Sequence, residues 1–428
     1  MDYKIAGLKL PLFILVAAVT IVAVYMGVLP TGMVGAFLFL IIFGELLNLL
    51  GDHTPIIKTY LGGGAIVSIF GGAALVYFKV VPEQTVESIS TFMKGGGFLD
   101  FYIAALITGS ILGMNRKLLI NASIKYLPCI IGAVAAAVGF VALGSFIVGM
   151  KSTEAIAYIG IPIMGGGMGA GAVPISKVFE SALNVPAETI MGRLVPAVAL
   201  GNAMAIVAGG LLNRLGKNRP NLTGYGQLVR VEDDSLKSVK KEAIVLSSVT
   251  DYGAGIAAAT AFFTFGAIVS ALMKMIGVDI HTYAWMIISV AIVKALNLLP
   301  ESIENICEGW YNFVAKNFTA ALMLGIGMAY TNLGDIIEAF TPQYFVLVLL
   351  VVLGAIIGAG LIGHLVGFYA IEAAITAGLC MANMGGTGDV AVLTASDRME
   401  LMPFAQISSR LGGAFIILIA SFLVPIFF

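Results

Sequence analysis

Two glycine-rich stretches decide the fold of this chain: Met164-Gly165-Gly166-Gly167-Met168-Gly169-Ala170-Gly171-Ala172-Val173 and Met384-Gly385-Gly386-Thr387-Gly388-Asp389-Val390-Ala391-Val392. Aligning their Gly-Gly-x-Gly units also aligns Ala172-Val173 with Ala391-Val392. An Arg-Leu pair follows each stretch, at Arg193-Leu194 and at Arg410-Leu411. We infer an internal repeat whose offset is about half of the chain.

The composition excludes a soluble protein. The 428 residues are 59% hydrophobic and only 11% charged, and the mean hydropathy is +1.02. Because an average soluble domain is about 25% charged, a chain this apolar needs lipid as the solvent for most of its surface. Transmembrane β-barrels show alternating strands of about ten residues, and the sequence lacks that pattern. The composition therefore predicts an α-helical membrane protein embedded in the lipid bilayer.

Apolar segments of about 20 residues, the length that spans a bilayer, predict eleven transmembrane helices. We place them at 8–27, 31–50, 64–80, 99–115, 124–150, 188–212, 247–275, 280–299, 315–331, 345–366 and 402–427. Two further segments, 155–176 and 368–390, are too rich in glycine to be simple spans. Segments 81–98 and 300–314 are expected to be loops, the first outside the cell and the second inside.

Lysine and arginine in short loops set the orientation, because they accumulate on the cytoplasmic side. Lys4 and Lys9 precede the first helix, and the polar stretch 213–242 carries seven lysine and arginine residues. Six crossings, an even number, separate these two basic regions, so both are expected in the cytoplasm. The N-terminus is then cytoplasmic and the C-terminus lies outside.

The repeat and the crossings together predict the domain organisation. Residues 1–30 form an extra N-terminal helix, and 31–212 form a first repeat of five crossings with a hairpin at 155–176. Residues 213–245 form a cytoplasmic linker, and 246–428 form a second five-crossing repeat with a hairpin at 368–390. Because five is odd, the two repeats have opposite topology, which is typical of secondary transporters with broken helices at matching positions. The alternative is that the glycines merely allow close helix packing.

The broken segments suit the binding of an organic anion beside a cation. Irregular backbone at membrane depth is tolerated where it is buried in protein or lines a cavity. Free N–H groups at a half-helix N-terminus attract carboxylate oxygens, and free carbonyls at the opposite ends suit Na⁺. Neutral oxygens near the second hairpin also suit Na⁺, although helix capping or interhelical hydrogen bonds would explain them equally. They belong to Asn383, Thr387, Ser408 and Ser409.

Arg410 lies inside the apolar segment 402–427. An intramembrane arginine needs a partner or a function, and its planar fork matches a carboxylate in a bidentate manner. We expect Arg410 to contact the substrate, the alternative being a structural ion pair with Asp389 or Glu372. Its repeat mate Arg193 lies near an expected membrane interface and could extend its charge into water.

At these residues the sequence resembles the 2-hydroxycarboxylate transporter family, the bacterial citrate, malate and lactate carriers. The matching stretches are Pro162–Pro174 (PIMGGGMGAGAVP), Glu372–Asp389 (EAAITAGLCMANMGGTGD) and Phe404–Gly413 (FAQISSRLGG). The resemblance implies eleven crossings with two re-entrant hairpins in the bacterial cytoplasmic membrane. It also implies a homodimer and an elevator-like motion of a transport domain against a fixed dimerisation domain.

The resemblance carries the expected site residues. The essential arginine of the Ser-Ser-Arg-Leu-Gly-Gly motif falls on Arg410, and the sodium-site residues fall on Asn383, Thr387, Ser409 and main-chain groups near Ile163 and Met381. We expect substrate contacts from Gly166, Gly167, Met168, Gly169, Met384, Gly385, Gly386 and Arg410. We expect sodium contacts from Ile163, Met381, Asn383, Thr387, Ser408 and Ser409.

Two positions depart from the sodium–citrate members of the family. Those members have Asn where this chain has Met168, and Arg where it has Met384. A charge that loses a buried partner costs about 2–5 kcal/mol, so a tricarboxylate would keep an unmatched carboxylate here. We therefore expect a smaller substrate, L-malate, with one carboxylate on Arg410 and the other on hairpin N–H groups.

The leading hypothesis is thus a sodium-coupled L-malate symporter without a cofactor other than the coupling ion, and without a nucleic-acid partner. Within this class, a proton-coupled malate/citrate symporter and a malate/lactate exchanger remain alternatives. A channel would need a continuous polar pore or a filter motif. A membrane enzyme subunit would need a reactive nucleophile or a metal cluster, and Gly165–Gly169 lacks the Lys-Ser/Thr pair of a phosphate loop. We therefore expect no enzymatic activity.

Overall fold

The computed structural model describes residues 4–55, 57, 63–114, 116, 126–230, 246, 248–276, 281–339 and 341–428. These residues are almost entirely helical, apart from a small antiparallel pair of strands, β1 (Lys4–Ile5) and β2 (Leu8–Lys9). The first half of the chain contains α1 (Leu10–Tyr25), α2 (Met33–His53), α3 (Gly64–Tyr77), α4 (Glu83–Met93), α5 (Phe98–Leu112), α7 (Leu127–Val148), α8 (Ser152–Ala155), α9 (Ile161–Ile163), α10 (Val173–Leu183) and α11 (Ala187–Asn218). The second half contains α12 (Val249–Met275), α13 (Thr282–Leu296), α14 (Glu301–Tyr330), α15 (Leu333–Ala339), α16 (Pro342–Leu365), α17 (Ala370–Ala373), α18 (Gly386–Ala395), α19 (Met402–Ile407) and α20 (Gly413–Phe427).

Eight helical spans in the described part of the chain are long and apolar enough to cross a membrane. They are Met33–His53, Glu83–Leu112, Leu127–Val148, Ala187–Asn218, Val249–Met275, Glu301–Tyr330, Pro342–Leu365 and Phe404–Phe427. The expected crossings at 8–27, 64–80 and 280–299 correspond to the shorter apolar helices α1, α3 and α13. A 15-residue helix is about 22 Å long, less than the roughly 30 Å of the hydrocarbon core. The helical membrane class is therefore confirmed, while eleven crossings stay a prediction.

Two segments expected to be loops are helical, and the expectation was wrong for a physical reason in each case. Within 81–98, α4 is amphipathic: Ile89 and Phe92 are buried while Glu83 and Glu87 are exposed. Its polar face lowers the average hydropathy that a span prediction uses. Segment 300–314 forms the first half of α14, where Glu304 is buried in an ion pair rather than displayed on a loop.

The linker expected at 213–245 is only partly non-helical. Helix α11 continues to Asn218, and a 3₁₀ turn follows at Pro220–Leu222. The chain then runs past α16, where the amide of Arg230 donates to the carbonyl of Gly367 over 2.9 Å. Residues 231–245 of the expected linker lie outside the described residues.

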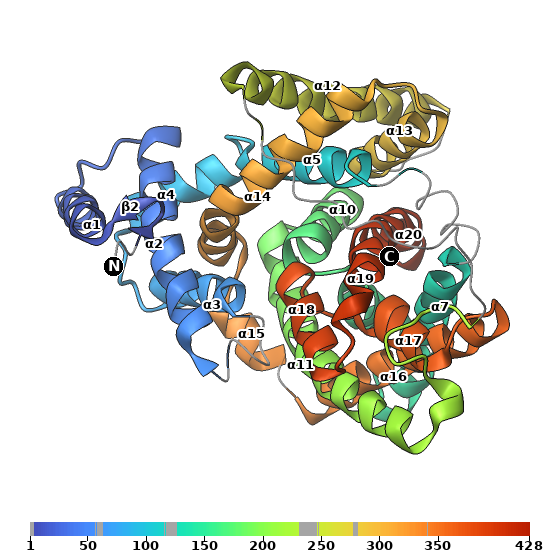
Figure 1. Cartoon of the computed structure of the whole chain (residues 1–428). Coiled ribbons are helices and arrows are strands. Elements are labelled where there is room, and N and C mark those ends of the chain that lie inside the picture. The colour runs from blue at the N-terminus through green and yellow to red at the C-terminus, as the bar shows by residue number, and fades with distance from the viewer. Residues whose placement is uncertain are drawn as a thin grey trace.

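The helices form two bodies, and each takes elements from both halves of the sequence (Figure 1). In the first body, which we name the panel, α14 packs against α2, α3 and α5, and α12 packs against α13 and α14. In the second, which we name the core unit, α16 packs against α7, and α11 packs against α10, α16 and α18. The panel comprises α2–α5 and α12–α14, and the core unit comprises α7–α11 and α16–α20.

Small residues bring the helices of both bodies into close contact. A Cβ atom added to Gly358 on α16 would overlap the carbonyl oxygen of Gly132 on α7. In the panel, a Cβ atom on Gly44 would lie 2.6 Å from the carbonyl oxygen of Ala320 on α14. Since lipid supplies no hydrophobic force between helices, such close packing supplies much of the attraction.

The two glycine-rich segments are interrupted helices. The first runs from Ser152 to Leu183 and is broken at 164–167, and the second runs from Ala370 to Ala395 and is broken at 380–385. They begin and end a few residues away from the expected 155–176 and 368–390. Gly167 has φ 124° and Gly385 has φ 73°, backbone conformations that favour glycine. The breaks therefore fall where the glycine pattern placed them.

Candidate functional site

The two glycine turns contact each other inside the core unit. The amide of Gly166 donates to the carbonyl of Met381 over 3.2 Å. A Cβ atom on Gly385 would lie 2.9 Å from the carbonyl oxygen of Gly166, and one on Gly167 would lie 2.7 Å from that of Met384. The main chains therefore approach within a distance that a larger residue would prevent.

A buried cluster of oxygen atoms lies behind the second turn. The Ser409 hydroxyl lies 2.9 Å from both carboxylate oxygens of Asp389 and 3.0 Å from the carbonyl oxygen of Cys380. The amide group of Asn383 donates to Asp389 over 2.9 Å. Asp389 is only 1% exposed. Because one hydroxyl has one hydrogen, it satisfies one of its three neighbouring oxygens at a time. Oxygen atoms from a carboxylate, a hydroxyl and a main-chain carbonyl thus meet in one buried place, a set of groups that suits a cation such as Na⁺.

Arg410 follows this cluster directly and points out of it. Its Nη1 atom lies 3.4 Å from the carbonyl oxygen of Ser110 on α5, and its guanidinium lies 5.6 Å from the centre of the Tyr311 ring on α14. Arg410 has no ion pair with Asp389, Glu372 or any other residue in the described ranges. Asp389 is near enough for an electrostatic attraction to Arg410, but no carboxylate of the described residues lies within 4.0 Å of the guanidinium, which lines the cavity and can contact a ligand there.

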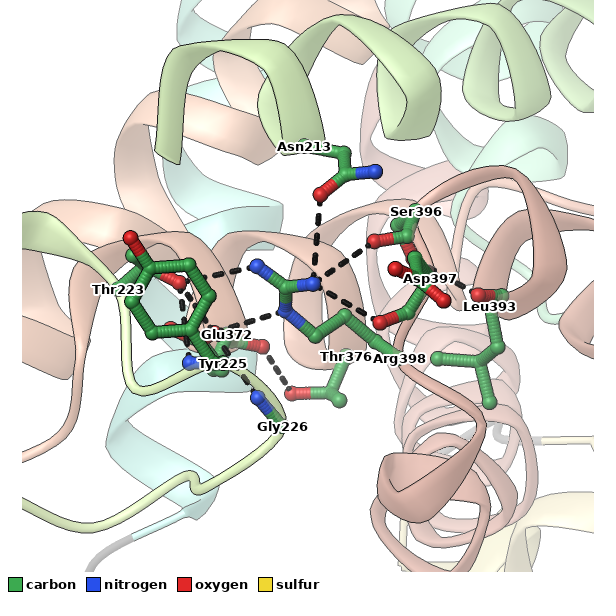
Figure 2. A network of polar contacts seen from close by, with 10 residues as sticks. All are labelled: Asn213, Thr223, Tyr225, Gly226, Glu372, Thr376, Leu393, Ser396, Asp397 and Arg398. Carbon is green, nitrogen blue, oxygen red and sulfur yellow. Dashed lines mark hydrogen bonds and ion pairs between the residues drawn. The ribbon is translucent and has the colours of Figure 1, made fainter. Parts of the chain in front are cut away.

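Glu372, the other expected structural partner of Arg410, pairs instead with Arg398. Figure 2 shows the network in which Arg398 donates from Nε to Oε1 of Glu372 over 3.0 Å. The same carboxylate oxygen accepts from the hydroxyl of Thr223 over 2.7 Å. Glu372 is fully buried and Arg398 is 3% exposed. This network joins the segment after α11 to the start and the end of the second interrupted helix, away from Arg410.

Arg193, the repeat mate of Arg410, lies elsewhere. Its guanidinium lies 3.5 Å from the centre of the Tyr158 ring and 3.4 Å from the carboxylate of Glu154. Arg193 and Tyr158 border a separate cavity of about 230 Å³ near the start of α16. Arg193 therefore has protein partners and does not reach the cavity that Arg410 lines.

A cavity of about 480 Å³ lies between the panel and the core unit. Its volume is within the usual range of about 300–1,000 Å³ for small-molecule sites. From the core unit it is lined by Gly166, Met168, Gly169, Met384, Gly385, Asp389, Ser409 and Arg410. From the panel it is lined chiefly by Glu45, Asn48 and Asp52 of α2, Tyr102 and Ser110 of α5, and Tyr311, Lys316 and Thr319 of α14.

Six of the eight expected substrate residues line this cavity, namely Gly166, Met168, Gly169, Met384, Gly385 and Arg410. Gly167 packs against the second turn instead. The expected sodium residues lie mostly behind the turns. The carbonyl of Met381 accepts from Gly166, and Ile163 is buried beside Gly201 of α11. The side chain of Thr387 lies outside the described residues.

Ser408 and Ser409 have different surroundings although they are adjacent. The hydroxyl of Ser408 lies 2.7 Å from the phenol oxygen of Tyr126, at the start of α7. Only the hydroxyl of Ser409 joins the oxygen cluster. Ser408 therefore faces α7 rather than the oxygen cluster to which it was assigned.

Asn202 and Lys316 were not among the expected site residues. The carboxamide oxygen of Asn202, buried in α11, accepts from the amide of Met384 over 3.0 Å and thereby fixes the second turn. Lys316 lies at the middle of α14. Both residues are polar residues inside an apolar span, which is the signal that could have identified them. Lys316 was missed because the expected span 315–331 began at 315 and so placed this lysine at a helix end.

Comparison with known proteins places these features in a family. Residues 5–422 match the family model described as the 2-hydroxycarboxylate transporter family. Over 431 aligned residues the chain is 38% identical to the malate transporter MleP of Lactococcus lactis subsp. lactis, covering 100% of this chain and 99% of the relative. It is 37% identical over 428 residues to the Na⁺-malate symporter of Bacillus subtilis, covering 100% and 94%. It is 35% identical over 420 residues to the citrate/sodium symporter of Salmonella typhimurium, covering 98% and 94%.

Proposed function

Because the chain belongs to the 2-hydroxycarboxylate transporter family, whose members are transporters rather than enzymes, we propose that it imports L-malate by sodium symport. The observation that carries this proposal is the position of Arg410. It lines the cavity between the two bodies without a carboxylate partner in the described ranges, directly beside the oxygen cluster of Asp389 and Ser409.

Arg410 is proposed to bind one carboxylate of the substrate. Its fork presents two parallel N–H groups to a carboxylate, and Tyr311 and Ser110 hold the guanidinium at the cavity wall. The turns with Gly166 and Gly385 supply main chain that a small ligand can approach closely.

The lining at Met168 and Met384 supports L-malate rather than citrate. Both side chains line the cavity and offer it no charge. A third carboxylate would therefore lie against apolar groups, and an unmatched charge in such a place costs about 2–5 kcal/mol. A dicarboxylate avoids that cost.

Sodium coupling is proposed for the oxygen cluster. Asp389 contributes a carboxylate, Asn383 and Ser409 flank it, and the carbonyl of Cys380 lies at the end of a helical arm. Carbonyls at the ends of broken helices and oxygen-rich side chains are the usual groups around Na⁺ in such carriers. Ser409 contacts the cluster and its neighbour Arg410 contacts the cavity, so ion binding and substrate binding would be coupled through two adjacent residues.

The two-body arrangement supports alternating access of the elevator type. The core unit carries both glycine turns, Arg410 and the oxygen cluster, whereas residues of the panel line the cavity from the other side. Movement of the core unit along the panel would carry substrate and ion together. We further propose that the two interrupted helices are re-entrant hairpins of inverted repeats, and that the protein is a homodimer in the bacterial cytoplasmic membrane with a cytoplasmic N-terminus.

One observation favours a second candidate, proton coupling. Asp389 is a buried carboxylate beside the cavity and could carry a proton instead of sharing a sodium ion. A proton-coupled malate/citrate symporter would use the same cavity and the same arginine.

Ligand binding to the purified protein tests the proposal. If Na⁺ and L-malate bind together, each must raise the affinity for the other by the same factor. We expect L-malate binding, measured by calorimetry, to strengthen when choline is replaced by Na⁺ at constant ionic strength, with weaker binding of citrate. An L-malate affinity that does not depend on Na⁺ would contradict sodium coupling. The absence of L-malate binding would contradict the proposal that L-malate is the substrate.

A further inference from the structure

Among the described residues of the core unit that line the cavity, Arg410 is the one cation, so it can match one carboxylate of a dicarboxylate and leaves the second without a partner from that side. Met384 places no charge at the second turn. Three turn amides are already used within the protein: Gly166 donates to Met381, Met384 donates to Asn202, and Gly385 donates to Asn383. The remaining amides at the first turn are neutral, so a cation from elsewhere in the lining would supply the charge that a second carboxylate lacks.

Lys316 of α14 is the residue that meets this need. It is the sixteenth residue of a 30-residue helix, so its charge lies at mid-span, where a lysine is costly and is a functional candidate by default. Its side chain is exposed and lines the same cavity as Arg410. It has no ion pair or hydrogen bond with any residue that the structure describes.

The geometry along α14 places Lys316 within reach of a ligand held by Arg410. Tyr311, whose ring lies beside the Arg410 guanidinium, is on the same helix. Lys316 follows it by roughly 7–8 Å along the helix axis and about 140° around it, and both side chains line the cavity. The four-carbon stem of lysine is flexible and ends in a compact charge, so the ammonium group can close that distance to a carboxylate.

Lys316 does not form a structural ion pair with either of the described panel carboxylates that line the cavity. Asp52 accepts from the amide of Gly64 over 2.9 Å and from the side chain of Asn48 over 3.4 Å. Glu45 also lines the cavity, but Lys316 forms no ion pair with it, since both residues are described and neither has a partner within the 4.0 Å of an ion pair. A structural lysine at this depth would be expected to have such a partner.

We propose that Lys316 binds the second carboxylate of the substrate, and this rests on the proposed function in that the cargo is a 2-hydroxycarboxylate whose first carboxylate is held by Arg410. Arg410 belongs to the core unit and Lys316 to the panel, so a dicarboxylate bridges the two bodies in this arrangement. A monocarboxylate such as L-lactate is held by Arg410 alone. Lys316 thus supplies a positive charge to the cavity from the wall opposite Arg410.

The test compares inhibition of labelled substrate uptake by L-malate and by L-lactate in proteoliposomes. Lys316→Gln should raise the inhibition constant of L-malate by about 10- to 100-fold, as expected when a charged hydrogen bond is lost, and leave that of L-lactate within about twofold. Lys316→Arg should restore most of the preference for L-malate. Asn317→Ala, at an exposed neighbouring position, is the matched control and should change neither constant.

Moving the charge provides a second, independent readout. In the double variant Lys316→Gln/Met384→Arg, the preference for L-malate over L-lactate should recover, because the positive charge returns to the cavity from the core unit. Equal weakening of both inhibitors by Lys316→Gln, or no change for either, would overturn the proposal.

This comparison is separable from the proposed function. It does not depend on which ion drives uptake, and citrate can replace L-malate in it if citrate is the better substrate. Failure of sodium coupling or of malate selectivity would therefore leave a clear result for Lys316.

Discussion

The hydroxyl of Ser409 lies 2.9 Å from both carboxylate oxygens of Asp389, and the side chain of the next residue, Arg410, lines the cavity between panel and core unit. Adjacent residues of one π-helical turn, Ser408–Gly412, thus face two different environments. One side is a buried oxygen cluster and the other is the cavity. This arrangement gives a short physical link between a bound cation and a bound anion.

Replacing Asp389 with asparagine tests the oxygen cluster. The substitution keeps the shape but removes the negative charge, so the Na⁺ concentration for half-maximal uptake should rise at least about tenfold, as for a lost contact to a charged group. This concentration is measured from the uptake of labelled L-malate at a series of Na⁺ concentrations. Asp251→Asn, at the start of α12 away from the cluster, is the control. Unchanged sodium dependence in Asp389→Asn would remove this carboxylate from the ion site.

Replacing Arg410 with lysine tests the carboxylate contact. A point charge cannot replace two parallel N–H groups, so the affinity for L-malate should fall by about 10- to 100-fold, as for a lost charged hydrogen bond. The repeat mate supplies the control: Arg193→Lys changes a residue that pairs with Glu154 outside the cavity and should leave the affinity near normal. Near-normal L-malate affinity in Arg410→Lys would show that this arginine does not hold the substrate.

Replacing Met384 with arginine tests the account of substrate size. A positive charge at the second turn would match a third carboxylate, so uptake should shift from L-malate towards citrate. The measured quantity is the ratio of the two uptake rates at equal concentration, with Met399→Arg, at an exposed position away from the cavity, as the control. Loss of L-malate transport without a gain for citrate would contradict the account.

Replacing Glu372 with glutamine tests the stability of the network in Figure 2. The substitution leaves the charge of Arg398 buried without its partner, which should destabilise the protein by about 3–5 kcal/mol. Glu154→Gln is the matched control. Glu154 is also the third residue of an interrupted helix and also pairs with an arginine, but its side chain is partly exposed. Such exposed pairs contribute about 0–1 kcal/mol. Thermal unfolding in detergent should therefore show a large loss for Glu372→Gln and a small one for Glu154→Gln, and equal losses would refute the comparison.

The parts of the fold that could be predicted from sequence are those that a local rule determines. The turns at Gly167 and Gly385 were predictable because glycine readily adopts the positive φ found there. Most of the long apolar spans were predictable from hydropathy. Helix α4 was not, because its polar face hides the buried stripe of Ile89 and Phe92 from an average.

The site could be predicted only as far as motifs and repeats extend. The motifs and the repeat identified Arg410, Ser409 and the two turns as candidate site residues. Contacts between residues that are far apart in the sequence depend on how the helices pack, which motifs do not give. The pairing of Glu372 with Arg398 is one such case, since both Glu372 and Asp389 were equally plausible partners for Arg410. Lys316 is another, because only the meeting of α14 with the core unit brings it to the cavity.

The most direct test of the central claim is uptake of labelled L-malate into proteoliposomes under an imposed inward Na⁺ gradient, compared with an imposed pH gradient in choline. The account predicts accumulation with the Na⁺ gradient, and none with the pH gradient alone. Accumulation driven by the pH gradient in the absence of Na⁺, or uptake only in exchange for internal malate or lactate, would contradict sodium symport.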